Sequence, residues 1–137
     1  MNQTIANIAI VVKDYDEAIE FYTQKLKFDL IEDTKLSETK RWVLIAPKGS
    51  NGTRLLLAKA ANEEQATRIG NQAGGRVFLF LFTDDFKRDH QNLIEQNVKI
   101  VREPIQEVYG TVLVFADLYG NLWDLIESTG KTATPFV

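Results

Sequence analysis

The last apolar segment of the chain carries a carboxylate that could do chemistry. Asp124 stands between Trp123 and Leu125 in residues 122–127, a run typical of a strand. Because successive strand side chains point to opposite faces, the Asp124 carboxylate should point away from Trp123. In an apolar cavity, burial would raise its pKa, and it could act as a general base or hold a cationic ligand. The alternative is a salt bridge with Arg54, which has the same parity on the matching strand of the first half.

Other polar and aromatic side chains on expected strands could complete a ligand site. The Asn7 amide could orient a ligand carbonyl or hydroxyl, or it could bond a neighbouring backbone group at a strand end. Flat aromatic rings line pockets for planar ligands well, although aromatic residues on strands also serve as core. The candidate ligand-binding residues are Asn7, Trp42, Arg54, Tyr109, Phe115 and Asp124, and Asp124 is also the candidate catalytic residue.

The composition argues against several other chemistries. The chain has no cysteine, which removes disulfides, thiolate nucleophiles and thiolate metal sites. The single histidine, His90, falls on an expected helix beside polar residues, and no nucleophile elbow accompanies it. Neither a dinucleotide-binding fingerprint nor a Walker loop is present. The net charge is −3 without a basic stripe, so nucleic acid is not expected as a partner.

Length and hydropathy favour one soluble domain. The chain has 137 residues, of which 45% are hydrophobic and 26% charged, as in an ordinary globular domain. The longest apolar run, residues 77–82, is far too short to span a bilayer. The N-terminus lacks a basic flank and a cleavage-like site, so no signal peptide is expected. We therefore expect a cytoplasmic protein without a membrane partner.

The order of elements in the first half is strand, helix and three strands. Residues 5–12 form a short β-branched run that predicts a strand. Asp14 can cap the following helix, with Glu17 three residues on. The helix should cover residues 15–25, and turn residues separate the remaining strands. Those strands are expected at residues 28–32, 41–46 and 54–58.

The second half repeats this order, with Asp84 at the position of Asp14. Such repetition indicates one supersecondary unit used twice. Pro104 should end a strand, and Gly110 should permit a bulge or a close backbone approach. The second-half elements are a strand at 77–82, a helix at about 86–94 and strands at 98–102, 109–115 and 122–127. We thus expect one domain spanning 1–137, with module one at about 4–60, a linker at about 61–75, module two at about 76–128 and a loose tail at 129–137.

Three segments together carry a resemblance to a known family. They are residues 8–22 followed by 26–28, residues 83–86, and residues 109–111 followed by 115–117 and 120–121. In this order and spacing, residues 5–127 resemble the vicinal oxygen chelate superfamily, which includes glyoxalase I, bleomycin resistance proteins and extradiol dioxygenases. The resemblance implies an α+β fold of two βαβββ modules. Their strands would form a cupped, eight-stranded mixed sheet with helices on the outside and a small ligand inside.

Strand alternation predicts which side chains face this cup. On the first strand, Asn7, Ala9 and Val11 should face the cup. On the strand at 77–82, alternate residues starting at Val77 should line the cup, and the three phenylalanines should pack against the second helix. Those phenylalanines are Phe78, Phe80 and Phe82.

The resemblance also implies where a metal would bind. Metal-dependent members use a histidine on the first strand and a carboxylate on the last strand of each module. The matching positions here are Asn7, Leu56, Val77 and Asp124. Leucine and valine cannot ligate a cation, and one amide with one carboxylate is too small a donor set. We therefore predict no metal and no cofactor.

These observations favour metal-independent binding of a small organic molecule in the cup. By resemblance to bleomycin resistance proteins, binding would act by sequestration, and the protein would be a homodimer. The alternative is a glyoxalase I-like lyase or isomerase, or a dioxygenase, including a metal-free enzyme with Asp124 as the base. The sequence leaves open whether the protein is an enzyme.

Overall fold

The computed structural model describes residues 1–130 of the chain. The chain divides into two compact units, one spanning Met1–Gln72 and the other beginning at Ala73. Each unit contains one of the predicted modules and is described by itself. The prediction of a single domain over the whole chain stays a prediction, and from residue 131 the expected loose tail lies outside the described residues.

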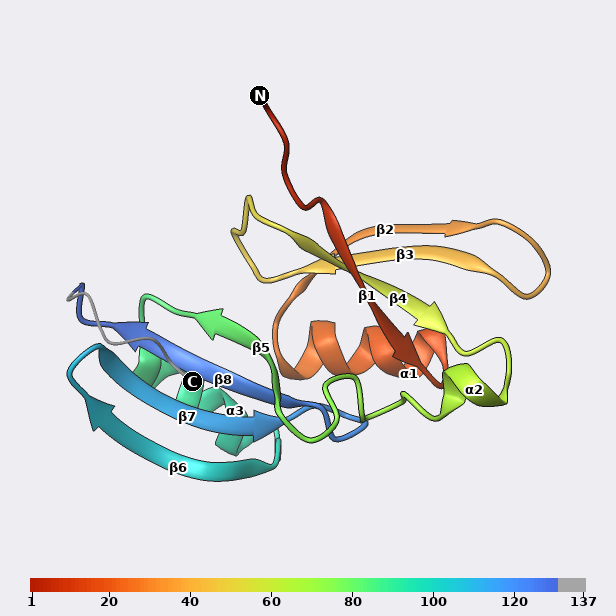
Figure 1. The fold of residues 1–137 in the computed structure, drawn as a ribbon. Helices are drawn as coiled ribbons and strands as arrows, with labels where there is room; N and C mark the ends of the chain where they lie inside the picture. The colour runs from red at the N-terminus through yellow and green to blue at the C-terminus, as the bar shows by residue number, and fades with distance from the viewer. Residues whose placement is uncertain (131–137) are drawn as a thin grey trace. The chain divides into compact units, whose positions relative to one another are not determined.

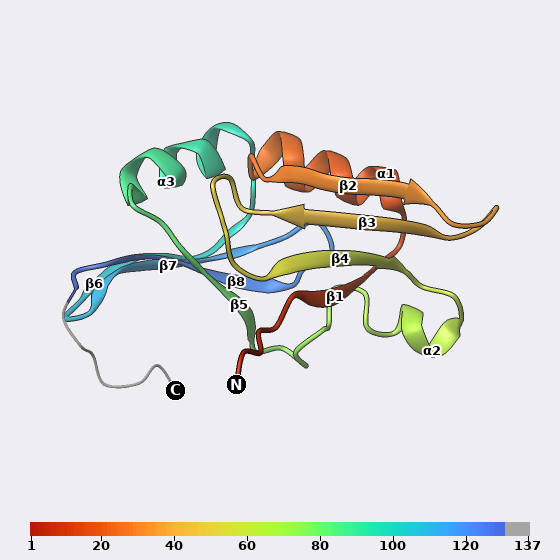
Figure 2. The ribbon, with the colours of Figure 1, turned by 90° about the horizontal axis from the view of Figure 1, so that it is seen from above.

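Module one contains a four-stranded mixed sheet and a helix that lies along one of its faces (Figures 1 and 2). The strand order is β1-β4-β3-β2, with β1 parallel to β4 and the other pairs antiparallel. The helix continues as a short π-helical segment, η1. The elements are β1 (Asn7–Val12), α1 (Tyr15–Glu20), η1 (Phe21–Lys25), β2 (Asp29–Lys35), β3 (Arg41–Ala46), β4 (Arg54–Lys59) and α2 (Glu63–Ala66).

Module two repeats the same arrangement, which confirms the two predicted βαβββ modules. Its strand order is β5-β8-β7-β6, with β5 parallel to β8 and the other pairs antiparallel. Helix α3 contacts β8 (Figure 2). The elements are β5 (Val77–Phe82), α3 (Phe86–Glu95), β6 (Ile100–Glu107), β7 (Gly110–Ala116) and β8 (Leu122–Ser128).

Aspartate caps start both long helices. Asp14 Oδ2 accepts a hydrogen bond of 2.9 Å from the Glu17 backbone N–H, as predicted. Asp85 accepts one of 3.0 Å from the Arg88 N–H at the start of α3. Each bond satisfies an N–H that has no partner within its helix. Within the described residues, no helix is long and apolar enough to cross a membrane.

The predicted alternation of side chains along β1 is confirmed, and the cup that Asn7, Ala9 and Val11 would face stays a prediction. Ile10 and Val12 are fully buried, on the side where α1 packs, and their neighbour Leu57 on β4 is fully buried with them. Asn7, at the start of the alternate set, is exposed. An uninterrupted register between β1 and β4 preserves this alternation from end to end.

The predicted facing of β5 is wrong beyond its first residue. Val77 pairs with Leu122 of β8, but a bulge follows, and Leu79 then pairs with Trp123. The extra residue shifts the register by one, and a one-residue shift turns every following side chain to the other face. Phe80 and Phe82 are therefore 50% and 63% exposed instead of packed against α3.

The prediction that Pro104 ends a strand is also wrong. Strand β6 continues to Glu107, so Pro104 lies inside it. The ladder between β6 and β7 shifts register between Arg102 and Ile105, which places the proline in an irregular stretch of an edge strand. Proline has no N–H to donate, and an edge strand at a bulge tolerates this loss.

Candidate functional site

Strand β8 turns the Asp124 carboxylate away from helix α3. Glu127 Oε1 accepts a hydrogen bond of 2.8 Å from the Phe86 backbone N–H at the start of α3, so Glu127 faces the helix. By alternation, Trp123 and Leu125 share that side, and both are buried. Asp124 therefore points to the opposite face of the module-two sheet, which we call the Asp124 face.

The turn before β8 fixes this orientation. Asp117 is buried, and its Oδ1 accepts hydrogen bonds from the backbone N–H groups of residues 119–121. Its Oδ2 accepts bonds from Asn121 Nδ2 at 3.0 Å and from Trp123 Nε1 at 3.3 Å. The Trp123 ring also stacks on Phe115, with centroids 5.8 Å apart. Since Trp123 is held on the helix side of the sheet, the side chain of its neighbour Asp124 points to the opposite face.

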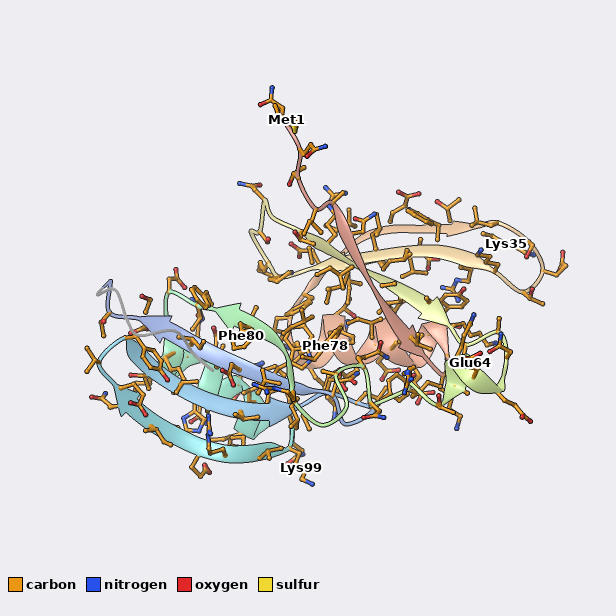
Figure 3. The ribbon with its side chains drawn as sticks, in the orientation of Figure 1. Met1, Lys35, Glu64, Phe78, Phe80 and Lys99 are labelled. Atoms are coloured by element: carbon orange, nitrogen blue, oxygen red, sulfur yellow. The ribbon has the colours of Figure 1, made fainter. Side chains whose placement is uncertain are left out.

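Two cross-strand rows make up the centre of the Asp124 face. Residues paired across a sheet share a face. The first row, which we call the Asp124 row, runs through β5, β8, β7 and β6 as Phe80, Asp124, Val114 and Arg102. The next row runs in the same order as Phe82, Ile126, Val112 and Ile105. Figure 3 labels Phe80 and, two residues before it on β5, Phe78. The face is thus mainly apolar, with one carboxylate inside it and one arginine towards its edge.

The Asp124 carboxyl group is buried and incompletely hydrogen-bonded. The residue is 6% exposed, and its Oδ1 accepts no hydrogen bond from the described part of the chain. Burial raises the pKa of Asp124, and the positive charge of Arg102 opposes that rise. A buried acceptor without a donor is uncommon in folded proteins, because its lost hydration is not replaced. Asp124 therefore has unused capacity to accept a donor.

Tyr109 lies within the electrostatic reach of Asp124. Burial raises the pKa of the Tyr109 hydroxyl, and the negative charges of Glu107 and Asp124 raise it further, while Arg102 acts against them. The residue itself is half-buried, between β6 and β7. The charge of Asp124 thus acts on Tyr109, another of the predicted site residues, and the charge of Arg102 acts on both.

Three further predicted residues share one face of the module-one sheet. Asn7 and Arg54 are register partners on β1 and β4. Trp42 lies on β3 and is half-buried. The adjacent Arg41 reaches the helix side, where its guanidinium lies 5.1 Å from the Tyr15 ring centroid, so Trp42 faces away from α1 with Asn7 and Arg54. Their part in binding, and the salt bridge between Arg54 and Asp124, stay predictions.

Phe115 is not brought together with Asp124. Its side chain is fully buried and stacks on Trp123, on the helix side of the sheet. Arg102, Phe80 and Phe82 lie on the Asp124 face but were not among the site residues predicted from the sequence. Arg102 shares the row of Asp124, but this pairing depends on the register of three strands. No short-range sequence signal reveals such a register.

The residues at the implied metal positions do not fit a metal. Asp124 Oδ1 could serve as a ligand atom, but its row neighbours Phe80 and Val114 offer no donor atom. Leu56 and Val77 offer none either. Residues 1–130 contain no group of three or more histidine, cysteine, aspartate or glutamate side chains placed to hold an ion. Metal independence stays a prediction.

Comparisons with known proteins agree with this architecture. An uncharacterized protein of Shewanella frigidimarina is 61% identical over 132 residues, covering 96% of this chain and 98% of its own. The crystal structure of UcmS2 has a TM-score of 0.80 at 29% identity, covering 92% of this chain and 98% of its own. The crystal structure of TnmS3, an antibiotic binding protein from Streptomyces sp. CB03234, has a TM-score of 0.73 at 27% identity, covering 94% and 98%.

A family model spans nearly the whole of both modules. The model described as the Glyoxalase/Bleomycin resistance protein/Dioxygenase superfamily matches residues 4–125, which run from just before β1 into β8. The match includes the strand order repeated in the two modules and the turn that orients Asp124. The chain therefore belongs to the Glyoxalase/Bleomycin resistance protein/Dioxygenase superfamily.

Proposed function

We propose that this protein binds a small organic molecule on the Asp124 face without a metal ion and holds it without converting it. The observation that carries the proposal is the buried Asp124 carboxylate, whose Oδ1 lacks a partner in the described residues. It lies in an apolar face that also exposes Phe80 and Phe82. Apolar walls with a few placed polar groups are typical of ligand sites.

The relatives support binding as the activity. TnmS3 is described as an antibiotic binding protein, and it shares the fold over nearly the whole chain. We also propose that the protein is a cytoplasmic homodimer that sequesters its ligand, as expected from the resemblance to bleomycin resistance proteins and from the lack of a predicted signal peptide. Asn7, Trp42 and Arg54 of module one are proposed to contribute to binding from their own sheet face.

A metal-free enzyme with Asp124 as base is the second candidate. The observation that favours it is the buried carboxyl group, because burial raises the pKa of Asp124 towards the range in which a general base works. Enzymatic conversion would also require a proton donor or an electrophilic group at the substrate. The charge of Arg102 acts on Asp124, and the charges of Asp124, Glu107 and Arg102 act on the Tyr109 hydroxyl.

Thermal-shift measurements against a panel of small organic molecules test the proposal. Binding to the native state alone raises the melting temperature with ligand concentration. We expect stabilisation by one or more organic compounds, unchanged by EDTA and by added nickel, zinc, manganese or iron salts. Stabilisation that requires metal would overturn metal-independent binding. Recovery of a chemically altered ligand after incubation would replace sequestration with the enzyme alternative.

A further inference from the structure

The chemistry of the Asp124 face restricts the class of ligand beyond the proposed function, on which this inference rests. Asp124 Oδ1 is an acceptor without a donor in the described residues, and it is buried in the middle of a sheet. A ligand with an O–H or N–H group can supply that donor. Hydrogen bonds to charged groups contribute more than those between neutral groups, so a donor-bearing ligand gains most at this point.

The charge at the edge of the face disfavours a cationic donor. Arg102 belongs to the Asp124 row, with Val114 between them. Two strand spacings separate the backbones of Arg102 and Asp124, about 10 Å, and the positive charge of Arg102 already acts on the carboxyl group. An ammonium ion next to Asp124 would be attracted by the carboxylate, but it would be repelled by Arg102 and would lose its hydration against apolar side chains, a loss that can exceed the gain of a buried ion pair. A neutral donor avoids both costs.

The neighbouring side chains favour a flat ring. Phe80 precedes Asp124 in its row and is 50% exposed, and Phe82 in the next row is 63% exposed. Tyr109 lies close enough for the Asp124 charge to act on its hydroxyl. Aromatic side chains pack well against other rings in offset or edge-on geometry. Val112, Val114 and Ile126 add a buried apolar floor between the aromatic side chains and Arg102.

We propose that the ligand of this face is a neutral aromatic compound that donates a hydrogen bond from a ring hydroxyl to Asp124 Oδ1. Its ring lies against Phe80 and Phe82, and its hydroxyl points at the carboxylate. Arg102, two strands away in the same row, offsets part of the Asp124 charge and so reduces what a cationic analogue would gain there.

Three matched probes test this inference on the native full-length protein. They are 2-naphthol, 2-methoxynaphthalene and 2-(aminomethyl)naphthalene, which share a ring system but carry a neutral donor, no donor and a cation. We expect 2-naphthol to bind at least about tenfold more tightly than either of the others, as measured by calorimetry, since one hydrogen bond to a charged group contributes that much. The comparison needs no variant and so does not depend on whether a variant folds.

The variant Asp124→Leu tests whether Asp124 causes the preference for 2-naphthol over 2-methoxynaphthalene. It should bind 2-naphthol and 2-methoxynaphthalene with equal affinity, because the acceptor is gone. Glu103→Gln, which removes one negative charge from an exposed position beside Arg102 on β6, is the matched control and should retain the preference.

Each unfavourable binding result would contradict a different part of the proposal. Equal binding of 2-naphthol and 2-methoxynaphthalene to the native protein would overturn the donor assignment and leave small-molecule binding intact. Tighter binding of 2-(aminomethyl)naphthalene than of 2-naphthol would overturn the inference that the ligand is neutral. Absence of saturable binding by all three probes would overturn the aromatic hydroxyl inference, whereas the proposed function would fall only with the broader thermal-shift panel.

Discussion

At the scale of single residues, the Asp124 carboxylate is buried without all the hydrogen bonds that would compensate for its lost hydration. It is buried among apolar side chains, and its Oδ1 accepts no hydrogen bond within the described residues. Folding therefore removes water from a carboxylate without replacing every bond. Such a cost is typical of residues kept for binding or catalysis, which are often the sites where local stability is sacrificed.

This cost gives the stability of the protein a defined pH dependence. The folded-state pKa of Asp124 lies above its ordinary value of 3.8. As pH rises from that value, the unfolded chain loses the Asp124 proton first, so this residue's contribution to the free energy of unfolding falls until the folded-state pKa is passed. The stability of Asp124→Asn relative to the native protein should therefore rise with pH above about 4 and then level off.

Urea denaturation across this pH range measures the effect. The variant Asp84→Asn, which alters a carboxylate that is 90% exposed, controls for the loss of one negative charge. The free energy of unfolding of Asp124→Asn minus that of the native protein should rise with pH. If this difference stays constant or falls, the raised pKa of Asp124 is contradicted.

Asp117 differs from Asp124, because its buried carboxylate accepts a full set of hydrogen bonds. It accepts bonds from three backbone N–H groups, the Asn121 amide and the Trp123 indole. We expect Asp117→Ala to destabilise the protein by about 2–4 kcal/mol, since it leaves several buried donors without an acceptor. In the same urea denaturation, Asp84→Ala should cost less than about 1 kcal/mol, as exposed ion pairs do. Equal losses would show that the Asp117 bonds do not hold the turn.

At the scale of elements, the bulge in β5 decides the character of the Asp124 face. Without it, Leu79 and Leu81 would take the positions that Phe80 and Phe82 occupy beside β8. The three-strand pairing in β8, β7 and β6 then sets Arg102 in line with Asp124. One inserted residue thus changes an aliphatic face into an aromatic one.

Gly110 holds the first residue of β7 close to β8. A Cβ at this position would lie 2.2 Å from the Glu127 backbone oxygen, which no real contact tolerates. We expect Gly110→Ala to separate the two strands and to destabilise the protein by about 2 kcal/mol or more, as overpacking does. Gly52→Ala is the control, because the nearest atom to its Cβ would be Ser50 Oγ at an ordinary 3.6 Å. Thermal unfolding should give a lower melting temperature for Gly110→Ala than for Gly52→Ala. Similar melting temperatures would contradict the close approach of β7 to β8 at Gly110.

At the scale of the whole molecule, the two modules share one topology but differ in polar content. Both sheets have the same strand order, with the first strand of each module parallel to the last. In the alignment of the halves, Leu56 of module one corresponds to Asp124 of module two. Only one of the two matching strand positions therefore carries a carboxylate, which makes the repeated fold asymmetric in its chemistry.

The proposed homodimer is tested at this scale. We expect analytical ultracentrifugation to give twice the mass of one chain, independent of added metal, because the resemblance to bleomycin resistance proteins implies a dimer. A monomer at micromolar concentration would contradict it. A dimer that dissociates on addition of a chelator would contradict metal independence.

The two modules, the cap of α1 and the side-chain alternation of β1 follow from the sequence alone, because they depend on local periodicity and on side chains a few residues apart. Asp14 could be assigned as a helix cap and Ile10 as a buried residue in this way. The strand pairing in the folded chain was needed to show that β6 passes through Pro104, that β5 bulges after Val77 and that Arg102 lines up with Asp124. Those features follow from pairing between strands distant in sequence, where one residue of register reverses every face.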